Sequence, residues 1–181
     1  YQGKGDYRYD AAKRCGIVVR GEIERQIRSQ QYRSQHVTVK LPSGRRIELV
    51  NLHLQPASTN MRLWSRDCWR IHRINRQLRR VELAFALEVL REHTPFPRRP
   101  TIMAGDFNAP ANDTIYKMLD SNFSDAFGSA GVGWGNTYHR RLPILRLDHI
   151  FSSKAFIPVR CRVVSIRESD HRMVVSDLIL Q

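Results

Sequence analysis

The sequence predicts a layered α/β fold with mixed sheets, and three features of the chain predict it. Short apolar runs bounded by turn residues occur before and after one long amphipathic segment. Apolar side chains recur in that segment at helical spacing, whereas the short runs are continuous or alternate, as strands do. No repeat, low-complexity stretch or linker divides the 181 residues, so we expect a single domain over residues 1–181.

The first third of the chain is predicted to contain a loop and three strands. Residues 1–13 are polar and aromatic without a period, and we interpret them as a loop. Residues 15–19 form an apolar run that is typical of a buried strand. Residues 36–41 alternate in polarity, and residues 47–54 return after a Pro-Ser-Gly-Arg turn at 42–45, so these segments predict a hairpin.

The middle of the chain is predicted to form one long helix over residues 60–92, which prolines at positions 95, 97 and 100 bring to an end. Its apolar side chains recur at steps of three and four residues and form one stripe: Ile71, Ile74, Leu78, Val81 and Phe85. Arginines follow a different face: Arg62, Arg66, Arg70 and Arg73. This face would suit a nucleic acid backbone, but we favour a solvated helix surface.

The second half of the chain is predicted to alternate turns with short elements. A strand over 101–104 leads into a turn at 105–110, and a short helix is expected over 113–119. The glycine-rich segment at 128–138 predicts a long loop, and we expect its Trp134 to pack on the domain rather than stack on a base or enter an interface. Three further strands are expected at 147–152, 159–166 and 173–180.

The charge of the chain favours an anionic partner. Lys and Arg number 30 against 17 Asp and Glu, a net charge of +13, and only five of the basic residues are lysine. The planar arginine fork suits phosphate oxygens, so nucleic acid, phosphoinositide and membrane surfaces are the favoured partners, although an arginine-rich composition alone would explain the same excess.

Other features exclude several classes of protein. The hydrophobic content of 41% excludes a disordered tail, and no apolar run is long enough for a transmembrane helix. The three cysteines are widely spaced, which disfavours a zinc site or a disulfide framework and leaves one bridge open.

Four segments place polar or ionisable side chains on, or directly after, an apolar strand. They are Asn-Leu-His-Leu at 51–54, Gly-Asp-Phe-Asn at 105–108, Arg-Leu-Asp-His at 146–149 and Ser-Asp-His at 169–171. Because ligands of open α/β sheets bind beyond strand ends, we expect these ends to converge. The expected site contains His53, Asp106, Asn108, Asp148, Asp170 and His171.

The residue types in this expected site suit metal-assisted hydrolysis of a phosphate ester. Carboxylates hold Mg²⁺, a histidine beside a carboxylate is a general acid or base, and Asn and His donate to phosphoryl oxygens. Each segment alone has a plainer interpretation, as a core histidine or a turn former. Four such segments in one chain favour a site.

In their sequence and order these motifs resemble the endonuclease/exonuclease/phosphatase family, which includes deoxyribonuclease I, exonuclease III, neutral sphingomyelinases and inositol polyphosphate 5-phosphatases. The Gly-Ile-Val-Val-Arg run at 16–20 is similar to a weaker family strand, with Val19 in place of the usual serine. The resemblance extends from about residue 15 onward. It implies a four-layer α/β sandwich, with two mixed β-sheets face to face and helices outside.

The resemblance also implies a role for each catalytic candidate. Asp106 would orient or deprotonate the attacking water, and Asn108 would contact the scissile phosphate. His171 would be the catalytic histidine, with Asp148 holding its far nitrogen. His53 would donate to a phosphoryl oxygen or to the leaving group. The substrate would be a phosphate ester, most plausibly a phosphodiester in a nucleic acid or a phospholipid head group.

The metal site is where the chain departs from the family pattern. Asp170 would lie beside Mg²⁺ or Mn²⁺, as a ligand or through water. The family opens with a strand carrying an Asn and a later strand ending in Gln-Glu, and neither has a counterpart here. Glu22 and Glu24 follow the 16–20 strand and do not match that Glu in order. We therefore expect the C-terminal portion of the domain, with an incomplete metal site and unpaired strand edges.

The expected activity follows from this departure. Without the family Glu, these 181 residues would hydrolyse phosphodiesters weakly or not at all. The alternative is a non-catalytic module that binds nucleic acid or phosphate on the same fold. A chelator would abolish the activity of the enzyme, whereas the binding of a module would show only salt dependence.

Overall fold

The computed structural model describes residues 5–10, 15–28, 32–57, 62, 64–94, 99–119 and 121–181. Its elements, in chain order, are β1 (Asp6–Asp10), β2 (Cys15–Val19), β3 (Glu22–Arg28), β4 (Ser34–Lys40), β5 (Arg46–His53), α1 (Arg66–His93), β6 (Thr101–Asp106), the 3₁₀ helix η1 (Thr114–Met118), β7 (Phe123–Asp125), α2 (Ala126–Ala130), β8 (Asp148–Ser153), β9 (Phe156–Val164) and β10 (Met173–Leu180).

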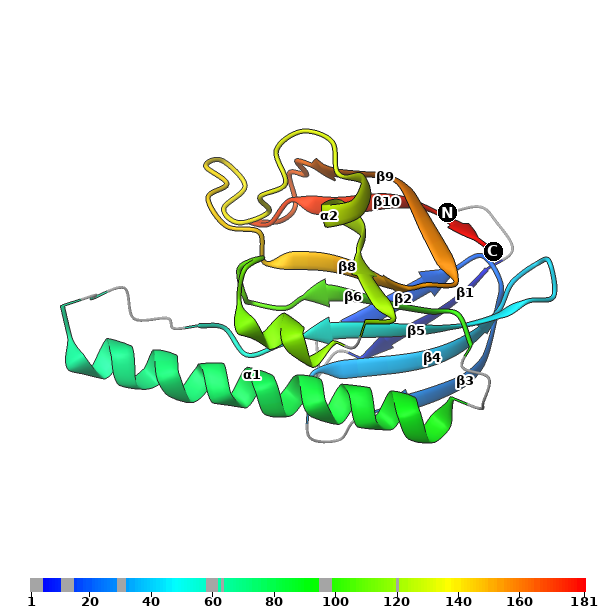
Figure 1. The fold of residues 1–181 in the computed structure, drawn as a ribbon, viewed down its shortest axis with the longest axis horizontal. Helices are drawn as coiled ribbons and strands as arrows, with labels where there is room; N and C mark the ends of the chain where they lie inside the picture. Colours follow the sequence, from blue (N-terminus) through cyan, green and yellow to red (C-terminus); the bar gives the residue numbers. More distant parts are fainter. Residues whose placement is uncertain are drawn as a thin grey trace.

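Six strands form one mixed sheet in the order β3-β4-β5-β6-β8-β7 (Figure 1). Neighbouring strands are antiparallel except β5 and β6, which are parallel. Parallel neighbours need a long crossover connection, and α1 provides it. The predicted mixed α/β fold is confirmed.

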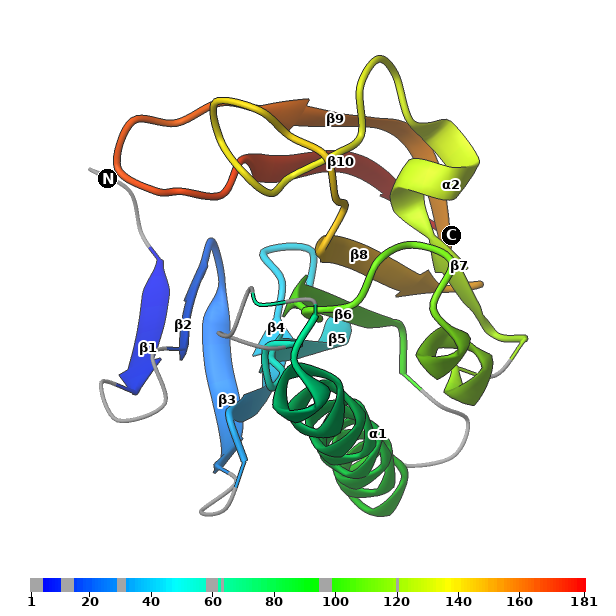
Figure 2. The same cartoon turned by 90° about the vertical axis from the view of Figure 1, so that its left-hand side faces the viewer.

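The two faces of this sheet are covered differently. Figure 2 shows α1 on one side and the strand pairs β1–β2 and β9–β10 on the other. Beneath α1 lies one apolar cluster, which includes Val50, Leu52, Leu83, Met103 and Phe151. A second cluster on the opposite face joins the sheet to β2 and to Phe156 of β9, and includes Ile17, Val37, Val39 and Ile47.

The strand pairs on the second face are two separate two-stranded antiparallel sheets. Within the described part of the chain, β2 pairs only with β1, and β10 pairs only with β9. The predicted unpaired strand edges are therefore present.

The long helix is confirmed, but most of its predicted apolar stripe does not face the core. Ser65 caps the helix, because its hydroxyl accepts a hydrogen bond from the backbone N–H of Asp67 at 3.2 Å. Two apolar rows overlap on this helix, and the sheet contacts the row that contains Leu83, Ala86 and Leu90. The side chains of Ile74, Leu78 and Val81 are exposed.

The ends of this helix also differ from the prediction. The helix begins at Arg66, and residues 60, 61 and 63 of the predicted span lie outside the described residues. Positions 95 and 97, two of the three prolines expected to end the helix, also lie outside the described residues. The four arginines of the basic face are exposed, as expected: Arg62, Arg66, Arg70 and Arg73.

Several short elements were not predicted. The expected loop at 1–13 contains β1, and β3, β7 and α2 lie where no element was expected. The sequence of β3, Glu-Ile-Glu-Arg-Gln-Ile-Arg, has few apolar residues because it is an edge strand of the sheet. The expected short helix at 113–119 is a 3₁₀ helix, and the strand expected from residue 159 begins at Phe156.

The three cysteines are buried and form no disulfide. Among the described residues, no helix combines the length and apolarity needed to cross a bilayer.

Candidate active site

Three predicted site residues form a row across neighbouring strands. His53 at the end of β5 pairs in register with Asp106 at the end of β6, and Asp106 pairs with Asp148 at the beginning of β8. Side chains alternate between the two faces of a strand, and Leu52 and Met103 pack beneath α1. The row therefore projects from the face opposite α1.

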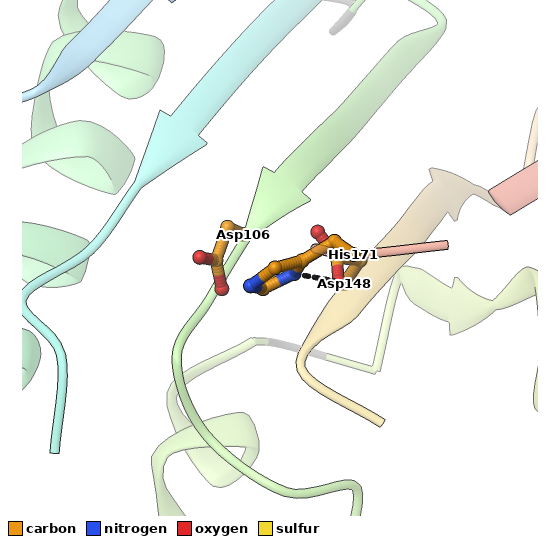
Figure 3. Close-up of side chains that lie close together, drawn as sticks. All are labelled: Asp106, Asp148 and His171. Atoms are coloured by element: carbon orange, nitrogen blue, oxygen red, sulfur yellow. Dashed lines mark hydrogen bonds and ion pairs between the residues drawn. The ribbon is translucent and has the colours of Figure 1, made fainter. Parts of the chain in front are cut away.

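The fourth member of this group comes from the segment before β10. The imidazole Nδ1 of His171 lies 2.7 Å from the carboxylate Oδ2 of Asp148, and this hydrogen bond confirms the prediction (Figure 3). The ring of His171 lies between the carboxylates of Asp106 and Asp148 in the same view. One ligand atom from each of these three residues lies within 4.8 Å of the other two.

The turn after β6 fixes the carboxylate of Asp106. The backbone N–H of Asn108 donates to Asp106 Oδ1 at 2.8 Å, and its side-chain amide donates to Oδ2 at 3.0 Å and to the Leu54 carbonyl at 2.8 Å. Asn108 has a left-handed backbone, with φ of 49°. At Gly105, with φ of 138°, an added Cβ would lie 2.0 Å from the Leu52 carbonyl oxygen. This turn therefore requires Gly and favours Asn at these positions.

The pKa values of the two central groups, Asp106 and His171, are both raised. Burial, and then the charge of Asp148, raise the pKa of Asp106 to about 6, although the hydrogen bonds from Asn108 and the nearby His171 oppose the rise. The hydrogen bond to Asp148 raises the pKa of His171, against the opposing effect of burial. Charges on Asp106 and Asp170 raise it further. The site thus holds a proton acceptor and a proton donor side by side.

A buried group of aromatic rings packs against the turn after β6, on the side of the sheet that faces α1. Phe107, Tyr116, His149 and Phe151 lie with ring centroids between 4.9 and 5.8 Å apart. The Nε2 of His149 is 3.1 Å from the Arg146 carbonyl. Burial, and then the charge of Arg146, lower the pKa of His149 to about 4, so this ring is neutral at pH 7. His149 therefore packs under the site and does not enter it.

The remaining predicted residues differ in their placement. The Nε2 of His53 lies 3.9 Å from Asp106 Oδ2, which is too long for a direct hydrogen bond. Asp170 is exposed and does not belong to the group formed by Asp106, Asp148 and His171. Its backbone carbonyl instead accepts a hydrogen bond from the N–H of Arg140 at 2.7 Å.

Two residues that the sequence did not single out position the site. Thr137 is fully buried, and its hydroxyl accepts hydrogen bonds from the backbone N–H groups of Leu147 at 3.0 Å and Asp148 at 3.2 Å. Tyr138 pairs with His171 through an isolated β-bridge, and their rings lie 5.0 Å apart. Both lie at the end of the glycine-rich segment at 128–138, where no periodicity marks a positioning residue.

The loop between α2 and β8, which we call the 131–146 loop, corrects another expectation. Trp134 does not pack on the domain: 67% of its surface is exposed. Only its indole Nε1 is held, because it donates to the Pro143 carbonyl at 3.0 Å.

The model of the Endonuclease/Exonuclease/phosphatase family matches residues 10–171. No sequence among the curated proteins matches the chain. The mannosyl-6-phosphatase of Bacteroides thetaiotaomicron superposes with a TM-score of 0.64 at 20% identity, over 81% of this chain and 57% of that one.

Two further solved structures are similar. An endonuclease/exonuclease/phosphatase family protein of Bacteroides thetaiotaomicron has a TM-score of 0.62 and 20% identity, over 82% of this chain and 55% of that one. The human Nocturnin catalytic domain with bound sulfate has a TM-score of 0.57 and 23% identity, over 82% of this chain and 53% of that one. The chain thus spans little more than half the length of these structures, and the likeness shows a shared fold.

Proposed function

The chain belongs to the endonuclease/exonuclease/phosphatase family, and from this premise we propose that it is a metal-dependent hydrolase of phosphate esters, with phosphodiesters as its main substrates. One observation carries the proposal. The row of His53, Asp106 and Asp148 meets the imidazole of His171, so two carboxylates and two histidines share one end of the sheet.

In the proposed reaction each residue of the site has its own role. The carboxylate of Asp106 accepts a proton from the attacking water, and Asn108 holds that carboxylate in place. We also assign to Asn108 a contact with the scissile phosphate. Asp148 holds Nδ1 of His171 and leaves Nε2 to donate to a phosphoryl oxygen. His53, on the other side of Asp106, donates to a second oxygen or to the leaving group.

The donor set fits a divalent cation. The carboxylates of Asp106 and Asp148, which have oxygens within 4.8 Å of one another, are the oxygen ligands that Mg²⁺ and Mn²⁺ prefer. When bound, the ion supplies positive charge against the negative charge that develops on the phosphoryl oxygens. Asp170 directly precedes His171, and we assign it to the same ion through a bridging water.

Turnover by these 181 residues is expected to be slow, because no glutamate among the described residues joins the group formed by Asp106, Asp148 and His171. Glu24, one of the two glutamates near the front of the chain, instead pairs with Arg46 at 2.7 Å. The assay is therefore run with the protein in excess over substrate, so that a single slow turnover is measurable. The substrates are bis(p-nitrophenyl) phosphate, single-stranded DNA and a phospholipid, each with Mg²⁺ and with chelator.

We expect chelator-sensitive hydrolysis that falls by about 100-fold or more in Asp106→Asn and in His171→Ala. The matched control is Asp177→Asn, an exposed carboxylate on β10, which should hydrolyse at the parent rate. The proposal would be rejected if the parent protein bound phosphate esters without hydrolysing them. It would also be rejected if neither site variant changed the rate of hydrolysis. The former result would identify a phosphate-binding module.

A further inference from the structure

The 131–146 loop exposes four large apolar side chains. Val132, Trp134, Leu142 and Ile144 are each between 61% and 71% exposed, although all four lie on one loop. Soluble monomers rarely gather large apolar side chains on the outside, and such patches mark interaction surfaces. Figure 1 shows this loop in yellow, projecting from the body above the end of the sheet at which β8 begins.

This loop is held in shape by its own hydrogen bonds. The indole of Trp134 and the side-chain amide of Asn136 both donate to the Pro143 carbonyl, at 3.0 and 3.3 Å. Tyr138 and Leu145 exchange backbone hydrogen bonds of 2.9 and 3.0 Å. The exposed apolar side chains are thus presented on a preformed structure, which lowers the entropic cost of docking.

The charge of the loop selects the kind of surface it contacts. Residues 131–146 contain three arginines and no Asp or Glu. The guanidinium of Arg141, next to Leu142, makes no hydrogen bond or ion pair within the described part of the chain. Together with Arg167 it lines a cavity of about 540 Å³, whose wall also includes two carboxylates, Glu168 and Asp170. Apolar side chains beside an unpaired cation suit an anionic lipid surface.

The loop is also connected to the catalytic group. Its residue Tyr138 forms the β-bridge with His171, and Thr137 holds the backbone of Asp148. The first part of the loop is anchored to β9, because the N–H of Val132 donates to the Cys161 carbonyl at 2.8 Å. A surface that contacts this loop would therefore lie beside the catalytic residues.

We propose that the 131–146 loop docks the protein on an anionic phospholipid surface, with Val132, Trp134, Leu142 and Ile144 entering the head-group region and Arg141 facing the lipid phosphates. Docking itself is measured as binding, without turnover.

The first experiment measures co-sedimentation with vesicles of phosphatidylcholine, with and without phosphatidylserine. The double variant Leu142→Ser with Ile144→Ser should bind more than about tenfold more weakly, because two aliphatic side chains no longer enter the lipid. The matched control is Leu78→Ser, an exposed leucine on α1, which should bind like the parent. Equal binding by the double variant and the parent would overturn the proposal.

A second arm tests the charge. Arg141→Gln should weaken binding to phosphatidylserine vesicles by about fivefold, since one arginine near an anionic surface contributes about 1 kcal/mol. Arg160→Gln, an exposed arginine on β9, serves as the control and should change binding by less than about twofold. If both substitutions weaken binding equally, the attraction comes from net charge and the loop is not the docking surface.

A third arm reports on the loop directly. In a variant with Trp64→Phe and Trp69→Phe, only Trp134 fluoresces, and its emission should shift to the blue when anionic vesicles are added. Trp134-dependent binding of a single-stranded oligonucleotide without vesicle binding would assign the loop to base stacking instead. Asp106→Asn should bind vesicles like the parent, so a failed hydrolase assay and a failed docking assay remain distinguishable.

Discussion

At the scale of single residues, Asp148 sets the charge of His171. The 2.7 Å hydrogen bond between them is the largest cause of the raised His171 pKa, and the charge of Asp170 contributes less. We therefore expect Asp148→Asn to lower the His171 pKa clearly and Asp170→Asn to lower it less. The measurement is an NMR titration of the imidazole in the presence of chelator. An unchanged pKa in Asp148→Asn would contradict the hydrogen bond.

A second residue, Glu48, should control stability at acidic pH. It is fully buried, and its carboxylate is held by the side chains of His36 at 2.8 Å, Thr38 at 2.9 Å and Arg99 at 2.9 Å. Burial alone would raise the pKa of Glu48, but these three hydrogen bonds outweigh burial and lower it. Removing the charge leaves partners unsatisfied, so Glu48→Gln should lower the free energy of unfolding by about 3 kcal/mol at pH 7.

The sign of the pH dependence follows from the lowered pKa of Glu48. Its stabilising contribution is complete above the unfolded pKa, roughly 4.3, and is lost as the pH falls through the lower folded pKa. Denaturant unfolding of the parent should therefore show decreasing stability below about pH 4. Glu48→Gln should show a flatter profile in that window, and parallel profiles would refute the assignment.

At the scale of secondary-structure elements, the orientation of α1 is directly testable. Leu83 is fully buried against the sheet, whereas Leu78, only five positions earlier, is 43% exposed. Leu83→Ala should reduce the free energy of unfolding by about 3 kcal/mol, and Leu78→Ala by less than about 1 kcal/mol. Chemical denaturation of both variants decides the question. A larger loss for Leu78→Ala would mean that the row predicted from the sequence faces the core.

The same helix illustrates how far the sequence could predict the elements. A period of three and four residues predicted a helix over this segment, but two overlapping apolar rows fit that period and only tertiary contact selects one. Strands such as β5 and β6 were predicted because they are buried on both faces, and a strand buried on both faces has a nearly continuous run of apolar residues. The edge strand β3 was missed because it lies at the solvated edge of the sheet and its sequence has no such apolar run.

The candidate site likewise contains residues that the sequence could predict and residues that it could not. His53, Asp106, Asn108, Asp148 and His171 were predicted because each follows or ends an apolar strand in a family motif. Thr137 and Tyr138 were not, because their partners, Asp148 and His171, are 11 and 33 positions further along the chain. Such pairings depend on the path of the 131–146 loop, which has no periodicity to reveal it.

At the scale of the whole molecule, the sheets should differ in how well they protect their amides. β5 and β6 have hydrogen-bonded strands on both sides, whereas among the described strands β10 pairs only with β9. We expect the slowest hydrogen exchange in β5 and β6, and faster exchange at those amides of β10 that do not bond to β9. Exchange followed by NMR at two protein concentrations provides the measurement. Uniformly slow exchange along β10 at both concentrations would show that its outer edge is covered within the chain.

The close approach of the neighbouring strands β5 and β6 at Leu52 and Gly105 limits which sequence changes this protein can accept. Because the Leu52 carbonyl occupies the space of a Cβ at Gly105, a side chain at that position would collide with the backbone next to Asp106. Gradual adjustment at that position is therefore blocked, because every substitution of Gly105 disturbs the backbone that carries Asp106. New substrate preferences must arise where insertion and substitution are tolerated, and in this protein the surface adjoining the site that meets this requirement is the 131–146 loop.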